Sequence, residues 1–125
     1  AELGHDAVEE RLGVRAVLDD PAKGRYFVAE LAGRVVGQLM ITYEWSDWRN
    51  GDWWWIQSVY VAPAHRRQGA YAALHAHVLA AARAEAGVCG LRLYVERDNH
   101  GAQRTYESLG MADAGYRMYE TPTPG

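Results

Sequence analysis

The sequence predicts an α/β (α+β) fold with a mixed, mostly antiparallel sheet, a central parallel crossover and flanking helices. Strand-like runs between residues 25 and 61 are joined by short turns, which favours antiparallel neighbours. A long helical pattern at 68–86 then separates two strands, and such a crossover makes those two strands parallel. The run from Ile56 to Tyr71 reads as strand, proline stop, basic glycine turn and helix start.

The expected elements are, in order, a helix, three strands, a long helix, a strand, a short helix and a last strand, at 6–18, 25–31, 34–48, 52–61, 68–86, 91–96, 100–109 and 114–120. The first helix has a broken apolar period and ends before Pro21. Tight turns at Ala32-Gly33 and Asn50-Gly51 delimit the first three strands, and the second turn is the strongest hairpin signal in the chain.

The two later helices have their own start and stop signals. The long helix consists of good helix formers and ends at Gly87. The short helix ends at Gly110, and Asp98 or Asn99 can cap its start. Helical spacing predicts that the long helix buries one stripe of side chains, formed by Tyr71, Leu74, Val78, Leu79 and Ala82.

A two-residue loop at Asn50-Gly51 would fix the register of the hairpin. Glu44 would then lie opposite Gln57, and Trp48 opposite Trp53. Because side chains alternate along a strand, one face would carry Glu44, Ser46, Trp48, Trp53, Trp55 and Gln57. The other face would carry Tyr43, Trp45, Asp47, Trp54 and Ile56.

Length and composition narrow the class of protein. The 125 residues predict one domain at 1–120, followed by a tail at 121–125. A formal charge of −3 gives no reason to expect nucleic acid. A single cysteine, Cys89, fits a reducing compartment, and no apolar run is long enough to span a bilayer, so we expect a cytoplasmic protein without a membrane partner. The histidines lack ligand-like spacing, and no metal site is expected.

The basic glycine turn is a candidate phosphate site. A helix start presents unpaired backbone N–H groups at the positive end of the helix dipole, and Arg66 and Arg67 lie beside it. The turn lacks both the Gly-Lys-Ser/Thr ending of a nucleotide P-loop and the spacing of a dinucleotide fingerprint. Taken alone, a solvated helix N-terminus is the simpler interpretation, and only the surrounding order of elements favours a ligand.

From Arg25 to Glu120 the chain resembles the GNAT superfamily of N-acyltransferases. Three segments carry the resemblance: the strand SVYVAP at 58–63, the turn RRQGAY at 66–71, and NHGAQRTYESLGM at 99–111. The turn matches the family pattern Arg/Gln-x-x-Gly-x-Gly/Ala at Arg66 and Gly69, whereas Tyr71 stands where a small residue is usual. Compared with the family, the chain is expected to lack the first strand and part of the first helix.

The resemblance implies a GNAT-like fold and acetyl transfer from acetyl-CoA to a primary amine of a small molecule, by direct attack in a ternary complex. The pyrophosphate would bind the turn, and the pantetheine arm would pair with the strand of Val59 to Val61 where this strand leaves its parallel neighbour at a bulge. A backbone N–H near Val61 would stabilise the oxyanion. The implied cofactor-binding residues are Val59, Tyr60, Val61, Arg66, Arg67, Gln68, Gly69, Ala70, Tyr71, Asn99 and Tyr106.

Two residues are candidates for proton transfer. Tyr106 looks like the general acid that protonates the departing thiolate, although the residues alone favour a core tyrosine with a bonded hydroxyl. Some family members have a glutamate where this chain has Gln57, which cannot accept the proton. Glu44 is the candidate base, through a water, and a solvated strand carboxylate is an equally supported interpretation. Asn99 looks like a cofactor contact or a helix cap, and both can hold.

The tryptophan-rich hairpin is the candidate acceptor site. Aromatic faces beside carboxylates suit a cationic amine, and the expected substrate-binding residues are Trp45, Asp47, Trp48, Trp55 and Gln57. Aromatic pairs also stabilise hairpins, and exposed aromatics mark interfaces, so a homodimer is expected. The sequence is also consistent with two other functions: an acyl-CoA-binding module without catalysis, and an enzyme that acetylates a protein N-terminus or lysine.

Overall fold

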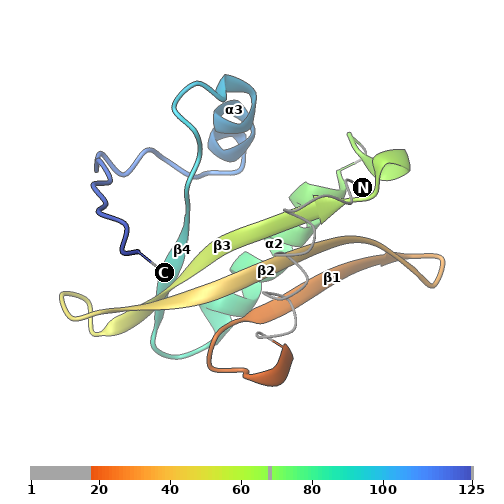
Figure 1. Ribbon diagram of the computed structural model, residues 1–125. Coiled ribbons are helices and arrows are strands. Elements are labelled where there is room, and N and C mark those ends of the chain that lie inside the picture. Colours follow the sequence, from red (N-terminus) through yellow and green to blue (C-terminus); the bar gives the residue numbers. More distant parts are fainter. Residues whose placement is uncertain (1–17, 68, 125) are drawn as a thin grey trace. The chain divides into compact units, whose positions relative to one another are not determined.

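The computed structural model describes residues 18–67 and 69–124, which fall into two compact units that divide after Tyr94 (Figure 1). The first unit contains β1 (Arg25–Leu31), β2 (Arg34–Ser46), β3 (Gly51–Val61), the 3₁₀ turn η1 (Pro63–His65), α2 (Ala70–Ala84) and β4 (Val88–Leu93). The second contains α3 (His100–Ser108). The helix expected at 6–18 lies, except for Leu18, outside the described residues.

The four strands form one mixed sheet in the order β1-β2-β3-β4. The pairs β1–β2 and β2–β3 are antiparallel, whereas β3 and β4 are parallel. Helix α2 connects β3 to β4 and covers one face of the sheet, where it contacts all four strands (Figure 1). A parallel neighbour cannot be reached through a tight turn, so the crossover needs this helix. The mixed sheet predicted from the sequence is confirmed.

The core lies between α2 and the sheet face that it covers. Its buried members are Leu39, Ile41, Trp54, Ile56, Leu74, Val78 and Ala82. They alternate along β2 and β3 and recur at helical spacing along α2, as half-buried elements require. The predicted stripe is confirmed as buried at Leu74, Val78 and Ala82, while Tyr71 and Leu79 are only half-buried.

The hairpin register predicted from Asn50-Gly51 is wrong. β2 ends at Ser46, which lies opposite Gly51, so residues 47–50 form a longer turn and Glu44 lies opposite Trp53 instead of Gln57. Only Asn50 in this turn has a positive φ, of 48°. Gly51 is the first residue of β3, and a Cβ there would come within 2.9 Å of the Gly87 carbonyl oxygen, so a glycine is needed for this close approach of two backbones.

The shift in register leaves the two faces of the hairpin as predicted from residue 43 to residue 56. Displacing the pairing by an even number of residues returns each side chain to its own face. Glu44, Trp53 and Trp55 therefore share the face away from α2. Trp54 and Ile56 are buried against α2. Trp48 lies in the turn and on neither strand, because β2 ends before it.

His75 is a buried polar residue on the core side of α2, with 3% of its surface exposed. Its Nδ1 lies 3.4 Å from the Tyr71 hydroxyl, one helical turn earlier. Burial lowers the pKa of His75 below its ordinary value of 6.5, because the imidazolium would lose its hydration.

The lowered pKa of His75 predicts that acid destabilises the fold. Below pH 6.5 the unfolded chain binds more protons than the folded chain, so this contribution to stability is complete above that pH and is lost as pH falls through it toward the folded-state pKa. Urea unfolding at about pH 7.5 and about pH 5.5 measures the loss. His75→Gln should lose less stability on acidification than the wild type, and equal losses would contradict the assignment.

The predicted boundaries of β4 and the predicted last strand need correction. β4 spans Val88–Leu93 instead of 91–96, because its ladder with β3 ends at Ile56 opposite Leu93. Residues 114–120 form no strand and are exposed. A strand needs a neighbour to pair its backbone, and within the described part of the second unit α3 is the sole regular element.

Helix α3 has the predicted caps. The Asn99 side-chain oxygen accepts from the backbone N–H of Ala102 at 3.1 Å, and Gly110 follows the helix with a φ of 93°. Within the described ranges, none of the helices has the length and apolarity that crossing a bilayer requires.

Candidate functional site

β3 has an open edge where it continues beyond its parallel neighbour. The β3–β4 ladder ends at Ile56 opposite Leu93, whereas β3 runs on to Val61. The ladder with β2 skips Gln57 at the same place, since Ile41 pairs with Ile56 and Met40 with Ser58. This irregularity is a bulge, because β3 has one residue more than β2 there, and it lies where the ladder with β4 ends. The expected separation of the two strands at a bulge is therefore present.

The backbone groups of Val59 and Val61 face this open edge. The N–H of Ala62 donates to the Val36 carbonyl of β2 at 2.8 Å, so the backbone of Ala62 points toward β2. Because backbone groups alternate along a strand, those of Val61 and Val59 point the other way. In agreement, the Val61 carbonyl accepts from Arg66 Nε at 2.9 Å instead of pairing with a strand. The open edge thus offers N–H donors in a row.

The glycine turn leads from this edge into α2 without a side-chain cap. Arg67 and Gly69 adopt left-handed conformations, with φ of 62° and 81°. The first helical bond joins the Ala73 N–H to the Gly69 carbonyl at 2.9 Å, so the N–H groups of Ala70 and Ala72 precede the helical hydrogen-bond ladder. The first turn of α2 carries no acidic side chain. These N–H groups suit an anion; Gln68 lies outside the described residues.

Two side chains of the turn region point away from this helix start. The Arg66 guanidinium lies 5.8 Å from the centre of the Tyr60 ring, beside β3. The Tyr71 ring meets His75 edge-on at 5.8 Å and packs against the core. The large residue at position 71 is therefore accommodated along α2, and its side chain does not fill the turn.

The sheet face away from α2 carries a cluster that we call the aromatic face, consisting of Glu44, Trp53, Trp55, Arg92 and Tyr94. Glu44 Oε1 accepts from Trp55 Nε1 at 3.2 Å and from Arg92 Nη1 at 2.9 Å. The Arg92 guanidinium lies 3.9 Å from the Trp53 ring centre. The Trp55 and Tyr94 rings stack at 4.4 Å. Glu44 is thus the centre of an ordered network.

Gly90 makes room for this arrangement. A Cβ at Gly90 would come within 2.6 Å of the Trp53 ring, so the ring can lie over β4 only because residue 90 has no side chain. Arg92 and Tyr94 were missed as site residues. Their alternation in the run LRLYV places them on one face. The register of β4 against β3, which brings them to Trp55, is a tertiary contact that no local pattern encodes.

Gln57 lies next to the aromatic face but does not meet Glu44. Its side-chain amide donates to Thr42 Oγ1 at 3.0 Å, and its side chain is exposed. Thr42 precedes Glu44 by two residues on the same face of β2, so the two polar pairs, Gln57–Thr42 and Trp55–Glu44, are neighbours along it.

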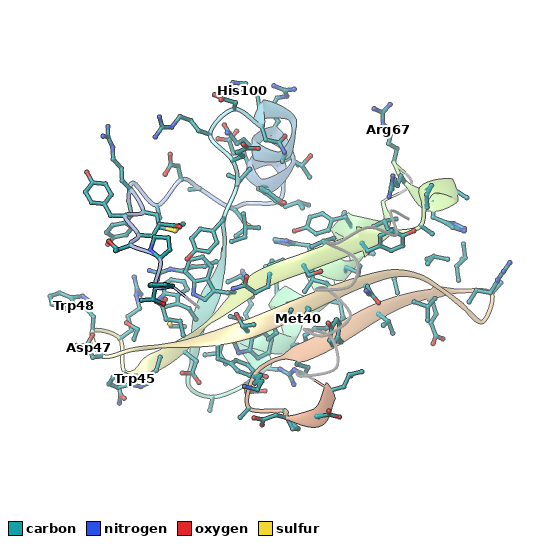
Figure 2. All side chains as sticks on the ribbon, viewed as in Figure 1. Met40, Trp45, Asp47, Trp48, Arg67 and His100 are labelled. Carbon is teal, nitrogen blue, oxygen red and sulfur yellow. The ribbon has the colours of Figure 1, made fainter. Side chains whose placement is uncertain are left out.

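The remaining predicted acceptor residues lie at the tip of the hairpin. Figure 2 shows Trp45, Asp47 and Trp48 gathered there, at the opposite end of the hairpin from Arg67. Trp48 is 92% exposed and Trp45 is 62% exposed. Trp45 lies opposite Asp52, on the other face from Trp55. The structure therefore brings Trp55 and Gln57 to the open edge and leaves the three tip residues away from it.

The second unit holds the other two predicted residues. Asn99 acts as the cap of α3. Tyr106 is half-buried, as are Ala102 and Leu109, which share its predicted face of α3. Over the described ranges, no three histidine, cysteine or acidic side chains cluster as metal ligands would.

Comparison with known proteins adds a family and a set of related structures. Residues 3–111 match the model of the acetyltransferase (GNAT) family. No curated protein matches the chain. A solved structure described as a possible acetyltransferase from Clostridium difficile 630 is 44% identical, with a TM-score of 0.88, over 100% of this chain and 81% of that one.

Two more distant structures are similar in fold. The ribosomal-protein-alanine N-acetyltransferase from Brucella melitensis biovar Abortus 2308 is 23% identical, with a TM-score of 0.71, over 90% of this chain and 79% of that one. AAC(6′)-Iy in complex with the bisubstrate analogue CoA-S-monomethyl-acetylneamine is 17% identical, with a TM-score of 0.73, over 98% of this chain and 84% of that one.

Proposed function

The chain belongs to the GNAT acetyltransferase family, and from this premise we propose that it transfers the acetyl group of acetyl-CoA to a primary amine of a small molecule. One observation carries the proposal: the open edge of β3 leads directly into the uncapped, arginine-flanked start of α2. An extended, peptide-like arm that ends in a pyrophosphate matches this arrangement, in which strand N–H groups are followed by the N–H groups of a helix start.

The cosubstrate site follows from the direction of these donors. The N–H groups of Ala70 and Ala72, with the left-handed turn before them, would hold the pyrophosphate. The exposed strand around Tyr60 would pair with the pantetheine arm through Val59 and Val61. The named complex of AAC(6′)-Iy with a CoA analogue supports this assignment, because that protein shares the fold.

The chemistry would be direct attack of the amine on the thioester carbon. An N–H on the open edge, at Val59 or Val61, would donate to the carbonyl oxygen as it becomes negative. Glu44 would take the ammonium proton through a water before the attack. As the carbon–sulfur bond breaks, Tyr106 would give its hydroxyl proton to the departing sulfur, and the proton that the new amide nitrogen loses would restore the tyrosine hydroxyl. Positioning of amine and thioester supplies much of the rate in such a ternary complex.

Two enzymes with the same fold support an amine as the acceptor, and their named acceptors are of different kinds. One is named for the alanine of a ribosomal protein, and the other is an aminoglycoside acetyltransferase seen with an acetylneamine analogue. We favour a small molecule because the Trp55–Tyr94 stack offers a platform of one ring's width beside the open edge.

Release of CoA thiol in the presence of amines tests the proposal. We expect acetyl-CoA to react with small primary amines faster than with peptides that carry a free N-terminus, with the acetylated product identified by mass spectrometry. Binding of acetyl-CoA without amine-dependent thiol release would instead indicate an acyl-CoA-binding module. Faster reaction with peptides would assign the protein-acetylating function.

Gly69 provides a matched pair of variants for the pyrophosphate site. A side chain at this position meets no atom within 4 Å, and its φ of 81° is one that Asn and Asp tolerate better than other residues. Gly69→Asp would place a negative charge beside the phosphates, whereas Gly69→Asn has nearly the same shape without the charge. We expect KM for acetyl-CoA to rise about tenfold more in the Asp variant. Equal KM values for the two variants would place the pyrophosphate elsewhere.

A further inference from the structure

Arg92 is held rigidly at the point where β3 and β4 part. In the parallel register it lies opposite Trp55, one pair before the ladder ends at Ile56 and Leu93. The Trp53 ring lies beneath its guanidinium at 3.9 Å, and Glu44 accepts from Nη1 at 2.9 Å. Two contacts of different kinds therefore fix both the plane and the rotation of the guanidinium, although the side chain is 31% exposed.

Arg92 has more hydrogen-bond donors than Glu44 uses. A guanidinium has five N–H donors in a fixed fork, and the hydrogen bond to Glu44 uses Nη1 alone among the described residues. A planar fork that is already held flat loses little entropy when it binds a second carboxylate. Arg92 is therefore preorganised to donate to an incoming anion.

The charges around Trp53 also favour an anion. The Arg49 guanidinium lies 5.1 Å from the centre of the same ring, so two guanidinium groups lie beside Trp53, and one of them, that of Arg92, is paired with Glu44. Asp52 lies opposite Trp45, on the other face of the hairpin. Around the Trp53 ring, two guanidinium groups therefore lie near one carboxylate, which favours an anion there.

The position of Arg92 sets the size of the acceptor. The Arg92 guanidinium lies over Trp53, and Gln57, where the open edge begins, follows Trp53 by four residues, which is about 13 Å along a strand. An amine at the open edge would therefore be several bonds away from an anionic group that reaches Arg92. The Trp55–Tyr94 stack would lie against the apolar part between them.

We propose that Arg92 binds a carboxylate of the acceptor, so that the acceptor is an amino-acid-like primary amine. This inference rests on the proposed acetyl transfer and adds the substrate class. Arg92 would act as a specificity-determining residue: it would orient the amine toward the thioester through the carboxylate and take no part in the proton transfers.

The test compares an amino acid whose amine and carboxylate are several bonds apart with its carboxamide, for example 6-aminohexanoate with 6-aminohexanamide, as acceptors of acetyl-CoA. We measure kcat/KM for both in the wild type and in Arg92→Gln, and use Arg49→Gln as a matched loss of a guanidinium from the same ring. The ratio of preferences between wild type and variant cancels the different basicities of the two amines. We expect Arg92→Gln to lower the preference for the carboxylate about tenfold or more, and Arg49→Gln, which removes a nearby charge from the hairpin turn, to lower it several times less.

Further measurements separate the ways in which this inference can fail. Arg92→Lys retains the charge but loses the fork, so it should lose most of the preference, and thermal unfolding of each variant reports whether the fold is kept. If the Gln variant does not fold, the Lys variant decides. An unchanged preference in the folded variants overturns the role of Arg92 while acetyl transfer stands. If the wild type releases no thiol with any amine although acetyl-CoA binds, both the proposed function and this inference are overturned.

Discussion

Replacing Tyr106 with phenylalanine is expected to lower kcat about 100-fold or more and to leave the Kd for acetyl-CoA nearly unchanged. The substitution removes only the hydroxyl that would protonate the departing thiolate, and the ring on α3 remains. A proton supplied in the transition state contributes to kcat and not to binding of the ground state. Single-turnover rates and equilibrium binding of CoA measure the two quantities separately.

Two exposed tyrosines of the same unit are matched controls for this variant. Tyr116 and Tyr119 are 83% and 88% exposed, and we expect Tyr116→Phe and Tyr119→Phe to retain wild-type turnover. The rate of the Tyr106 variant should also be followed against pH, because water or buffer acids can replace a lost general acid. Full activity of Tyr106→Phe at every pH tested would show that Tyr106 is not the acid.

Replacing Trp54 with alanine is expected to lower the free energy of unfolding by about 3–5 kcal/mol. Trp54 is 1% exposed, and its ring meets the rings of Phe27 and Tyr43 at 6.2 and 6.5 Å, while the Arg25 guanidinium lies 4.6 Å above it. Alanine would leave a cavity between sheet and helix. Since domains have total stabilities of about 5–15 kcal/mol, the variant should be close to unfolding at room temperature.

Urea unfolding followed by circular dichroism measures this loss, with Trp48→Ala as the control. Trp48 is a tryptophan of the same hairpin that is 92% exposed, and its removal should change stability by no more than about 0.5 kcal/mol. If Trp54→Ala does not fold, Trp54→Phe provides a smaller truncation with a measurable loss. Similar stabilities for the Trp54 and Trp48 variants would contradict the burial of Trp54.

Glu44 illustrates how tertiary contacts change the interpretation of a candidate residue. The sequence left it between a catalytic base and a solvated carboxylate. In the folded chain it binds Trp55 and Arg92 through Oε1 and thereby fixes two side chains beside the open edge. Glu44 would therefore hold these two side chains in place as well as accept the amine proton through a water.

Local signals predicted most of the elements correctly. β1 has the predicted bounds, α2 and α3 lie within the predicted ranges, and Asn99 caps α3. These features depend on interactions between residues close in the chain, such as the asparagine side chain with an N–H three residues later. The crossover between β3 and β4 was also predictable, because a long helix between two strands leaves few alternatives.

Register and strand ends were harder to predict. The Asn50-Gly51 signal placed a two-residue loop where residues 47–50 form the turn, because Gly51 was needed for contact with Gly87. The expected strand at 114–120 had suitable residues but found no pairing partner within the described part of its unit. Both outcomes depend on neighbours that are remote in sequence.

The sequence by itself determined the mixed sheet, the glycine turn before α2 and the family resemblance, since each of these is written in consecutive residues. The tertiary structure alone decided where β4 leaves β3, and so which β3 N–H groups face an open edge. It also decided that Arg92 meets Trp53 and Glu44, so that a guanidinium and a carboxylate share the face that carries Trp55. The reason is physical: a strand's alternation assigns a side chain to a face, but only its pairing partner determines which charges share that face.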